Sequence, residues 1–173
     1  MAVETIFNKY AVNQLGVVVE DVEKASELYS KLYGVGPFVI VDVARGMVKY
    51  YGADTPVQTR CAYAQYGDLQ IELIELVSEE PSVYSDLGRY GLHHLCVWVD
   101  DVDAAVAHMA DMGYQVAMEM NSSGMRIVYV DTVADLGYYV EFHNPMPALH
   151  DLGKQLREGW DGQTAYLNMA DLM

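Results

Sequence analysis

The order of apolar and polar residues that begins at position 13 returns, in degenerate form, at position 93. Each copy opens with two polar residues, Asn13 and Gln14 in the first and His93 and His94 in the second, and continues as a mostly apolar run. Each run ends at an Asp-Val step, after which the apolar residues are spaced as on one face of a helix. The pattern predicts a strand followed by a helix in both copies. The repetition predicts two modules related by a pseudo-twofold axis.

Further apolar segments, separated by Gly, Pro and Asp, complete each half of the chain. In the first half we expect strands over 12–19, 38–43, 47–51, 59–66 and 69–77. A helix is expected over 21–33, with Asp21 as its N-cap and Gly34 at its end. In the second half we expect strands over 92–99, 114–120, 126–132 and 137–142, and a helix over 102–112 that stops at Gly113.

These elements predict an α+β fold of two tandem βαβββ modules, 10–78 and 92–145. A linker over 79–91 joins them, and a helical extension follows over 146–173. A helix over 148–160 carries an apolar stripe of leucines, which we expect to cap the fold or a partner subunit. The first module is the longer one between positions 42 and 66, and we expect the extra residues to form a substrate-facing loop.

The composition is that of a globular protein with ample material for a core, because 52% of the 173 residues are hydrophobic. The formal net charge of -15 argues against binding to nucleic acids or to anionic membrane surfaces. The chain has neither a secretory signal pattern nor an apolar run long enough for a bilayer, so we expect a cytoplasmic protein. The two cysteines, Cys61 and Cys96, are expected to be reduced core thiols.

Four polar residues recur in the otherwise apolar strands: Gln14 and Glu72 in the first module, and His94 and Glu141 in the second. Taken singly, each is satisfied by the backbone or by solvent at a strand position. The repeat places Gln14 and His94, and likewise Glu72 and Glu141, in corresponding positions, and burying unpaired polar groups is costly. We therefore expect a shared divalent metal ion, and this ligand set suits zinc, nickel, cobalt, manganese or iron(II).

Other side chains are candidates for chemistry near these four. Because residues two apart in a strand share a face, Tyr139 and His143 lie on the face of Glu141, and His143 is a candidate second acid or base. Four residues are candidates for substrate binding, although Arg126 could equally form a cross-strand salt bridge: Tyr50, Arg126, Tyr129 and Tyr139. His93 is expected to point to the opposite face of its strand from His94.

The sequence resembles the vicinal oxygen chelate superfamily, the group of glyoxalases, bleomycin resistance proteins and dioxygenases. The resemblance rests on the duplicated pattern, the Gly34-x-Gly-Pro-Phe turn, and the Ile-Glu-Leu and Val-Glu-Phe strands around Glu72 and Glu141. It covers roughly residues 10–145 and is greatest for the glyoxalase I and methylmalonyl-CoA epimerase branch. It implies a cupped sheet around a metal held by Gln14, Glu72, His94 and Glu141, and it implies a homodimer.

The resemblance also implies an activity in which Glu141 removes a proton beside a carbonyl, and the ion stabilises the resulting enolate. We therefore expect an isomerase, epimerase or lyase acting on a small carbonyl or thioester substrate. The stretch 43–53 lacks the carboxylate that epimerases of the family use as a second base, so Lys49, a tyrosine or His143 would have to replace it. Two alternatives remain open: a metal-free ligand-binding or resistance protein, and a metal-dependent enzyme of aromatic catabolism.

Overall fold

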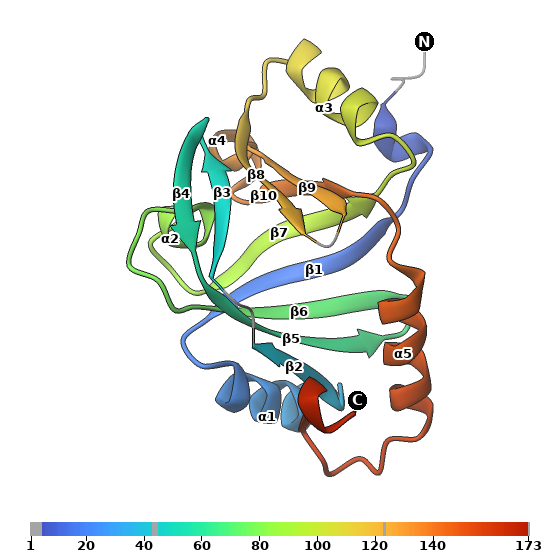
Figure 1. The fold of residues 1–173 in the computed structure, drawn as a ribbon. Helices are drawn as coiled ribbons and strands as arrows, with labels where there is room; N and C mark the ends of the chain where they lie inside the picture. Colours follow the sequence, from blue (N-terminus) through green and yellow to red (C-terminus); the bar gives the residue numbers. More distant parts are fainter. Residues whose placement is uncertain (1–4, 43–44, 123, 173) are drawn as a thin grey trace.

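A single mixed sheet organises the molecule (Figure 1). The computed structural model describes residues 5–42, 45–122 and 124–172. Eleven strands within these residues lie in the order β11-β2-β5-β6-β1-β7-β10-β9-β8-β3-β4. The strands are β1 (Val12–Val19), β2 (Phe38–Asp42), β3 (Gly46–Tyr50), β4 (Ala53–Val57), β5 (Thr59–Tyr66), β6 (Leu69–Leu76), β7 (Gly91–Trp98), β8 (Val116–Ser122), β9 (Met125–Val130), β10 (Tyr139–His143) and β11 (Tyr166–Asn168).

The duplication predicted from the sequence is visible in the strand pairing. β1 and β7 pair antiparallel at the centre, β6 runs parallel to β1, and β10 runs parallel to β7. Beyond them, β5 and β2 continue one half and β9 and β8 continue the other. The two halves therefore have the same strand order outward from the centre, as a pseudo-twofold relation requires. The α+β class with βαβββ-like repeats is therefore confirmed.

The longer first module carries a hairpin, β3–β4, that leaves its own half of the sheet. β3 pairs with β8, at the outer end of the second half. Asp42 and Gly46 are only four residue steps apart, at most about 14 Å of chain, although β2 and β3 lie near opposite ends of the strand order. The sheet therefore curls until its two ends approach each other. Val43, the last residue of the predicted strand 38–43, lies outside the described residues.

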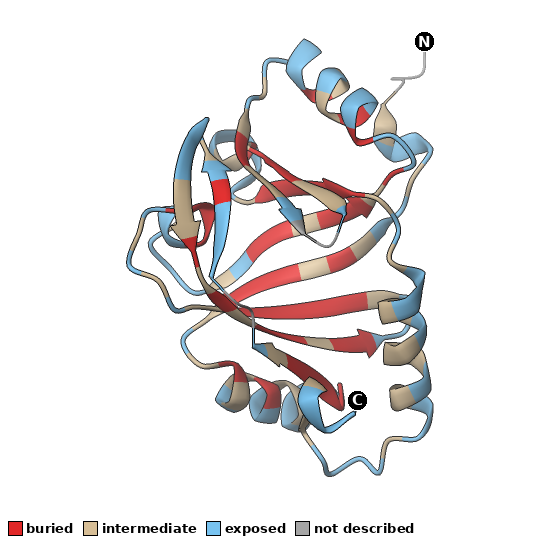
Figure 2. Cartoon of the chain, viewed as in Figure 1, coloured by how far each residue is buried: buried red, intermediate tan, exposed pale blue. Residues whose placement is uncertain are grey.

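Two long helices cover the outer face of the sheet, and their sequence signals are the predicted ones. The Asp21 carboxylate caps α1 (Val22–Tyr33) by accepting hydrogen bonds from two backbone N–H groups, and α1 ends at Gly34 with a left-handed φ of 62°. Asp101 caps α3 (Val102–Asp111) by accepting a hydrogen bond from the backbone N–H of Ala104. Each helix closes a core on its half of the sheet, around Phe38 and Leu73 under α1 and around Phe142 under α3 (Figure 2).

The predicted linker and C-terminal extension hold more structure than expected. The linker contains a short helix, α2 (Val83–Asp86), and another short helix, α4 (Val133–Leu136), precedes β10. The predicted helix over 148–160 is α5 (Pro147–Glu158), which packs on β5. β11, which was not predicted, adds a strand parallel to β2, and single 3₁₀ turns lie at Ile6–Asn8 and Met169–Asp171. No helix within the described residues is long and apolar enough to cross a membrane.

Candidate metal centre

The strand register brings the recurring polar positions of the repeat onto one inner face, opposite α1 and α3. Gly16 of β1 lies between Glu72 of β6 and His94 of β7 in one row across the sheet. In the next row Cys96 lies between Gln14 of β1 and Glu141 of β10. Residues in such neighbouring rows share a face, because side chains alternate along a strand with a period of two. The two modules thus contribute to one site.

Three of these side chains converge. The Nε2 atom of His94 lies 2.8 Å from Oε2 of Glu141 and 3.3 Å from Oε2 of Glu72. His94 has no exposed surface, and the exposed fractions of Glu72 and Glu141 are 8% and 3%. One ligand atom from each of the three lies within 4.8 Å of the others, so the group is able to hold a metal ion.

Two buried atoms of this cluster have no hydrogen-bond partner among the described residues. Neither Nε2 of His94 nor Oε2 of Glu141 makes a hydrogen bond within the described residues, although the two atoms are close together. Two buried polar atoms without partners are costly. The imidazole nitrogen and the carboxylate oxygens face one another without hydrogen-bond geometry. Such an arrangement suits a cation that lies between them. The residues present therefore fit a divalent metal.

The electrostatics of the cluster also favour a positive charge. Burial alone would lower the pKa of His94, but Glu141 and Glu72 outweigh burial and raise this pKa to about 9. Burial tends to raise the pKa of Glu141, but the attraction to His94 outweighs burial. The pKa of Glu141 is therefore lowered. Either a proton on His94 or a metal ion bound beside it can compensate the negative charge of Glu72 and Glu141.

Gln14 and His143 are the remaining predicted site residues next to the cluster. The amide nitrogen of Gln14 donates to Oε1 of Gln70 at 2.7 Å, a bond that does not use the amide oxygen, the atom through which Gln binds metals. His143 lies on the inner face beside Glu141, and its Nδ1–H donates to the carbonyl of Asn144. Cys96, Glu141 and His143 form a second buried group with ligand atoms within 4.8 Å.

His93 does not point away from His94, as the alternation of a regular strand predicts. The register shifts between Gly16, which faces His94, and Val17, which faces Leu92, so His93 is an extra residue in β7. Such a β-bulge interrupts the alternation. Nδ1 of His93 lies 3.0 Å from Nδ1 of His94, and its Nε2 lies 2.8 Å from the carbonyl oxygen of Val83.

The structure does not bring Arg126 to the centre. Arg126 alternates with Ile127 and Tyr129, which face His143 and Glu141 on the inner side, so it projects to the outer face. Its guanidinium pairs there with Glu119 and with Asp103 of α3. The ordinary salt-bridge interpretation therefore describes Arg126.

The three candidate tyrosines face the inner side, but their hydroxyl groups have protein partners. Tyr50 and Tyr139 both donate to the carboxylate of Asp86, at 2.7 and 3.0 Å. The hydroxyl of Tyr129 lies 3.0 Å from that of Tyr84, and its ring packs edge-on against His94, 5.2 Å between centroids. Of the three, Tyr129 is the one that packs against His94.

Two residues beside the cluster were not identified as site residues from the sequence. Gly16 leaves the space into which the His94 ring fits. Tyr63 of β5 lies directly opposite Glu72, and burial, together with Cys61 and Glu72, holds the pKa of its hydroxyl well above the usual value. A signal for Gly16 was available, because the repeat pairs it with Cys96 in the middle of an apolar strand.

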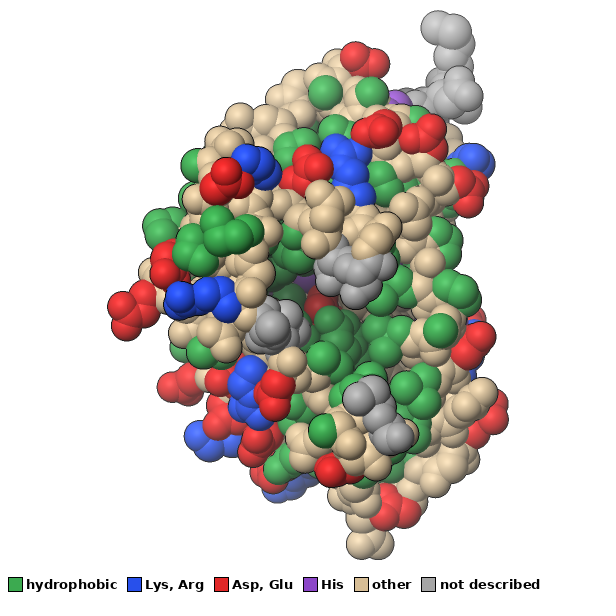
Figure 3. All heavy atoms as spheres, viewed as in Figure 1, with side chains coloured by type: hydrophobic (Ala, Val, Ile, Leu, Met, Phe, Trp, Pro, Cys, Tyr) green, Lys and Arg blue, Asp and Glu red, His purple; other side chains and the backbone are tan. Residues whose placement is uncertain are grey.

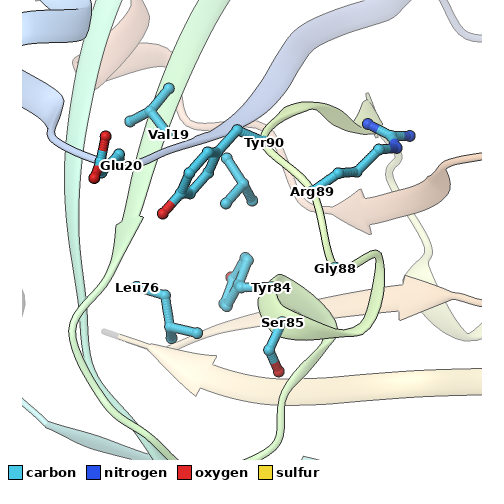
Figure 4. Close-up of a pocket in the computed structure, with 9 residues that line it drawn as sticks. Val19, Glu20, Leu76, Tyr84, Ser85, Gly88, Arg89 and Tyr90 are labelled. Atoms are coloured by element: carbon cyan, nitrogen blue, oxygen red, sulfur yellow. The ribbon is translucent and has the colours of Figure 1, made fainter.

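A hollow leads from the surface towards the centre. Figure 3 shows it in the middle of one face, with histidine and acidic atoms at its base and hydrophobic atoms on its wall. A separate pocket of about 390 Å³ lies where β1 and β6 end, against α2 (Figure 4). Arg89 at the rim of this pocket is bound to the carbonyls of Leu92 and Gly137, and none of the converging side chains lines it.

The fold and the converging groups define a class, that of duplicated βαβββ proteins with a candidate metal centre on the inner face of a curled sheet. The model of the glyoxalase/bleomycin resistance protein/dioxygenase superfamily matches residues 13–129, more than half of the chain. The chain belongs to this superfamily, as the resemblance of its repeated motifs indicated. No functionally curated protein gave a significant match to the sequence.

Solved structures share the fold at low sequence identity. A hypothetical protein from Bacillus halodurans has a TM-score of 0.61 and 17% identity, over 79% of this chain and 95% of that one. The Mycobacterium tuberculosis methylmalonyl-CoA epimerase has a TM-score of 0.54 and 18% identity, over 81% and 91%. A methylmalonyl-CoA epimerase in complex with methylmalonyl-CoA and NH4+ has a TM-score of 0.55 and 24% identity, over 77% and 92%.

Proposed function

We propose that this protein is a metal-dependent isomerase, epimerase or lyase that removes a proton from the carbon beside a carbonyl or thioester group. The observation that carries the proposal is the convergence of Glu72, His94 and Glu141, in which two buried atoms find no hydrogen-bond partner in the described part of the chain. Gln14, on the same face, is proposed as the fourth ligand through its amide oxygen. A bound divalent cation supplies a Lewis acid that stabilises negative charge on a carbonyl oxygen.

The chain's own carboxylate performs the proton transfer in this proposal. Glu141 is held at low pKa, so it is ionised and able to accept the proton. As the C–H bond breaks, its electrons form the carbon–carbon double bond of the enolate, and the carbonyl π electrons move onto oxygen. Return of the proton to the opposite face of the carbon gives epimerisation. In a substrate with a hydroxyl on the reacting carbon, such as a hemithioacetal, return to the neighbouring carbon gives isomerisation, because the hydroxyl proton moves to the enolate oxygen and the hydroxyl oxygen becomes the new carbonyl oxygen.

His143 is the proposed second proton carrier. Because its Nδ1–H is used by the carbonyl of Asn144, Nε2 is the ring atom that can accept or deliver a proton. It lies on the face of Glu141 and within the group that includes Cys96. It thereby supplies the second acid or base that the stretch 43–53 lacks.

The likeness to methylmalonyl-CoA epimerases makes a thioester the first substrate to test. Purified, untagged protein is first analysed for metal, beside His94→Ala and a His108→Ala control on α3. We expect about one equivalent of a transition metal in the parent and the control, and its loss in His94→Ala. Methylmalonyl-CoA and a hemithioacetal are then incubated with the parent and with Glu141→Gln in deuterated water, with exchange of the substrate proton as the readout.

If the parent contains no metal and takes up none on dialysis against zinc, nickel, cobalt or manganese, the enolate mechanism is wrong. In that case the ligand-binding alternative applies, and it predicts that the inner face binds an apolar ligand without metal.

A further inference from the structure

The bulge in β7 places a second imidazole directly behind the one that faces the carboxylates. His93 and His94 would point to opposite faces in a regular strand, but both face the inner side here, with their Nδ1 atoms 3.0 Å apart. Both rings are almost fully buried. His93 packs against Tyr84 and Tyr139, with ring centroids 5.2 and 5.1 Å apart, so its plane is fixed from two sides.

The partners of His93 determine which of its nitrogens carries the proton. Nε2 lies 2.8 Å from the carbonyl oxygen of Val83, and a carbonyl only accepts, so Nε2 must be the donor. A neutral imidazole carries a single N–H. His93 is buried among aromatic rings, with a carbonyl and an imidazole as its polar partners, and such surroundings hold an uncharged ring, so its Nδ1 carries a lone pair and accepts.

The position of the proton on His93 also determines the position of the proton on His94. Because Nδ1 of His93 accepts, Nδ1 of His94 must donate to it. The proton on Nδ1 leaves Nε2 as the only nitrogen of His94 that can offer a lone pair. Nε2 is also the atom that lies 2.8 Å from Glu141 and 3.3 Å from Glu72.

We propose that His93 is a positioning residue that fixes His94 with its proton on Nδ1 and its Nε2 lone pair directed at the metal. A series of hydrogen bonds thus runs from the Val83 carbonyl through His93 and His94 to the metal centre. Partners behind a metal-binding histidine commonly fix its tautomer and orientation, and their loss costs 10- to 100-fold in metal affinity. The proposal rests on the metal-dependent function proposed above and deepens it.

Two substitutions separate this role from simple packing. In His93→Asn the amide oxygen can occupy the place of Nδ1, so the acceptor for His94 is kept and the bond to Val83 is lost. In His93→Gln the amide reaches the place of Nε2, so the bond to Val83 is kept and the acceptor is lost. Asn is the smaller of the two side chains, so a packing role predicts the greater loss from His93→Asn, which is the opposite order.

The test measures zinc affinity by competition with a chromophoric chelator, in the parent, both variants and a His108→Gln control. We expect 10- to 100-fold weaker binding in His93→Gln, and binding within about threefold of the parent in His93→Asn and the control. In metal-free, ¹⁵N-labelled protein we expect a slowly exchanging Nδ1–H resonance of His94 in the parent and in His93→Asn, and its loss in His93→Gln.

The outcomes are distinguishable. Equal zinc affinity in the two His93 variants, or an unchanged Nδ1–H resonance in His93→Gln, would overturn the positioning role while leaving the metal-dependent function intact. A parent that binds no zinc, nickel, cobalt or manganese overturns both proposals.

Discussion

Gly16 and His94 face each other across the central pair of strands, and the imidazole occupies the space that a side chain at position 16 would need. A Cβ atom added to Gly16 would lie 1.9 Å from Cε1 of His94. No real contact is that short, so either the ring or the backbone of β1 would have to move. The position of the histidine therefore depends on the absence of a side chain on the neighbouring strand.

Gly16→Ala is expected to disrupt the centre and lower stability. Overpacking of a buried position typically costs 1–3 kcal/mol, and we expect roughly 2–3 kcal/mol here, together with loss of bound metal. Urea unfolding of the chelated protein and metal analysis measure the two effects. Gly46→Ala is the matched control, because a Cβ there meets no atom of the described residues within 4 Å. Equal behaviour of the two variants would show that the His94 ring is free to move.

The pseudo-twofold relation makes a second prediction, about Gln14. The position equivalent to Gly16 is Cys96, which faces Gln14 across the same strand pair. A Gln14→His substitution places a ring where a thiol side chain already lies, so we expect a destabilisation of roughly 1–3 kcal/mol. Adding Cys96→Gly should recover part of this loss. Urea unfolding of both single variants and the double variant gives the coupling energy, and additive effects would contradict the prediction.

Stability without metal should depend on pH through His94. Its pKa is raised from 6.5 to about 9 in the folded protein, so its contribution is complete below pH 6.5 and is lost as the pH rises through 9. The loss amounts to up to roughly 3 kcal/mol. Urea unfolding with a chelator present, at pH 6.5, 8 and 9.5, should reveal this decline in the parent. In His94→Gln this part of the decline should be absent, and a parallel slope would refute the assignment.

The attachment of the C-terminal extension should depend on Trp160. A Cβ at Gly36 would lie 2.8 Å from the indole, and the guanidinium of Arg157 lies 4.9 Å from the ring. We expect Trp160→Ala to lower the free energy of unfolding by roughly 2 kcal/mol and to raise hydrogen exchange in α5 and β11. Exchange in β1 and β7 should stay unchanged. Uniformly faster exchange in all four elements would instead indicate global destabilisation.

The duplication made much of this fold predictable from the sequence. β1 and α1, with the Asp21 cap and the Gly34 terminus, follow local signals that the structure reproduces. β4 was missed because Pro56 is typical of loops, and it is tolerated here since β4 is an edge strand. β11 was missed because a strand of three residues carries no readable period.

The candidate site was predictable only where strands are regular. The side chains of Glu72, His94 and Glu141 follow the regular alternation between the two faces of a strand, so the sequence predicted that these three residues share a face. His93 does not, because a bulge depends on how β7 pairs with β1 and not on its own residues. The partners of Tyr50 and Tyr139 were equally hidden, since Asp86 lies in a helix of one turn that no periodicity indicates.

The bond between His93 and the carbonyl of Val83 gives the connection between the two modules a part in the site itself. Val83 belongs to neither βαβββ repeat, because it lies in the segment that joins them. A dimer of separate single modules has no such segment, and so has no carbonyl to offer at this point. The bond is therefore a property of the two-module chain and not of either repeat.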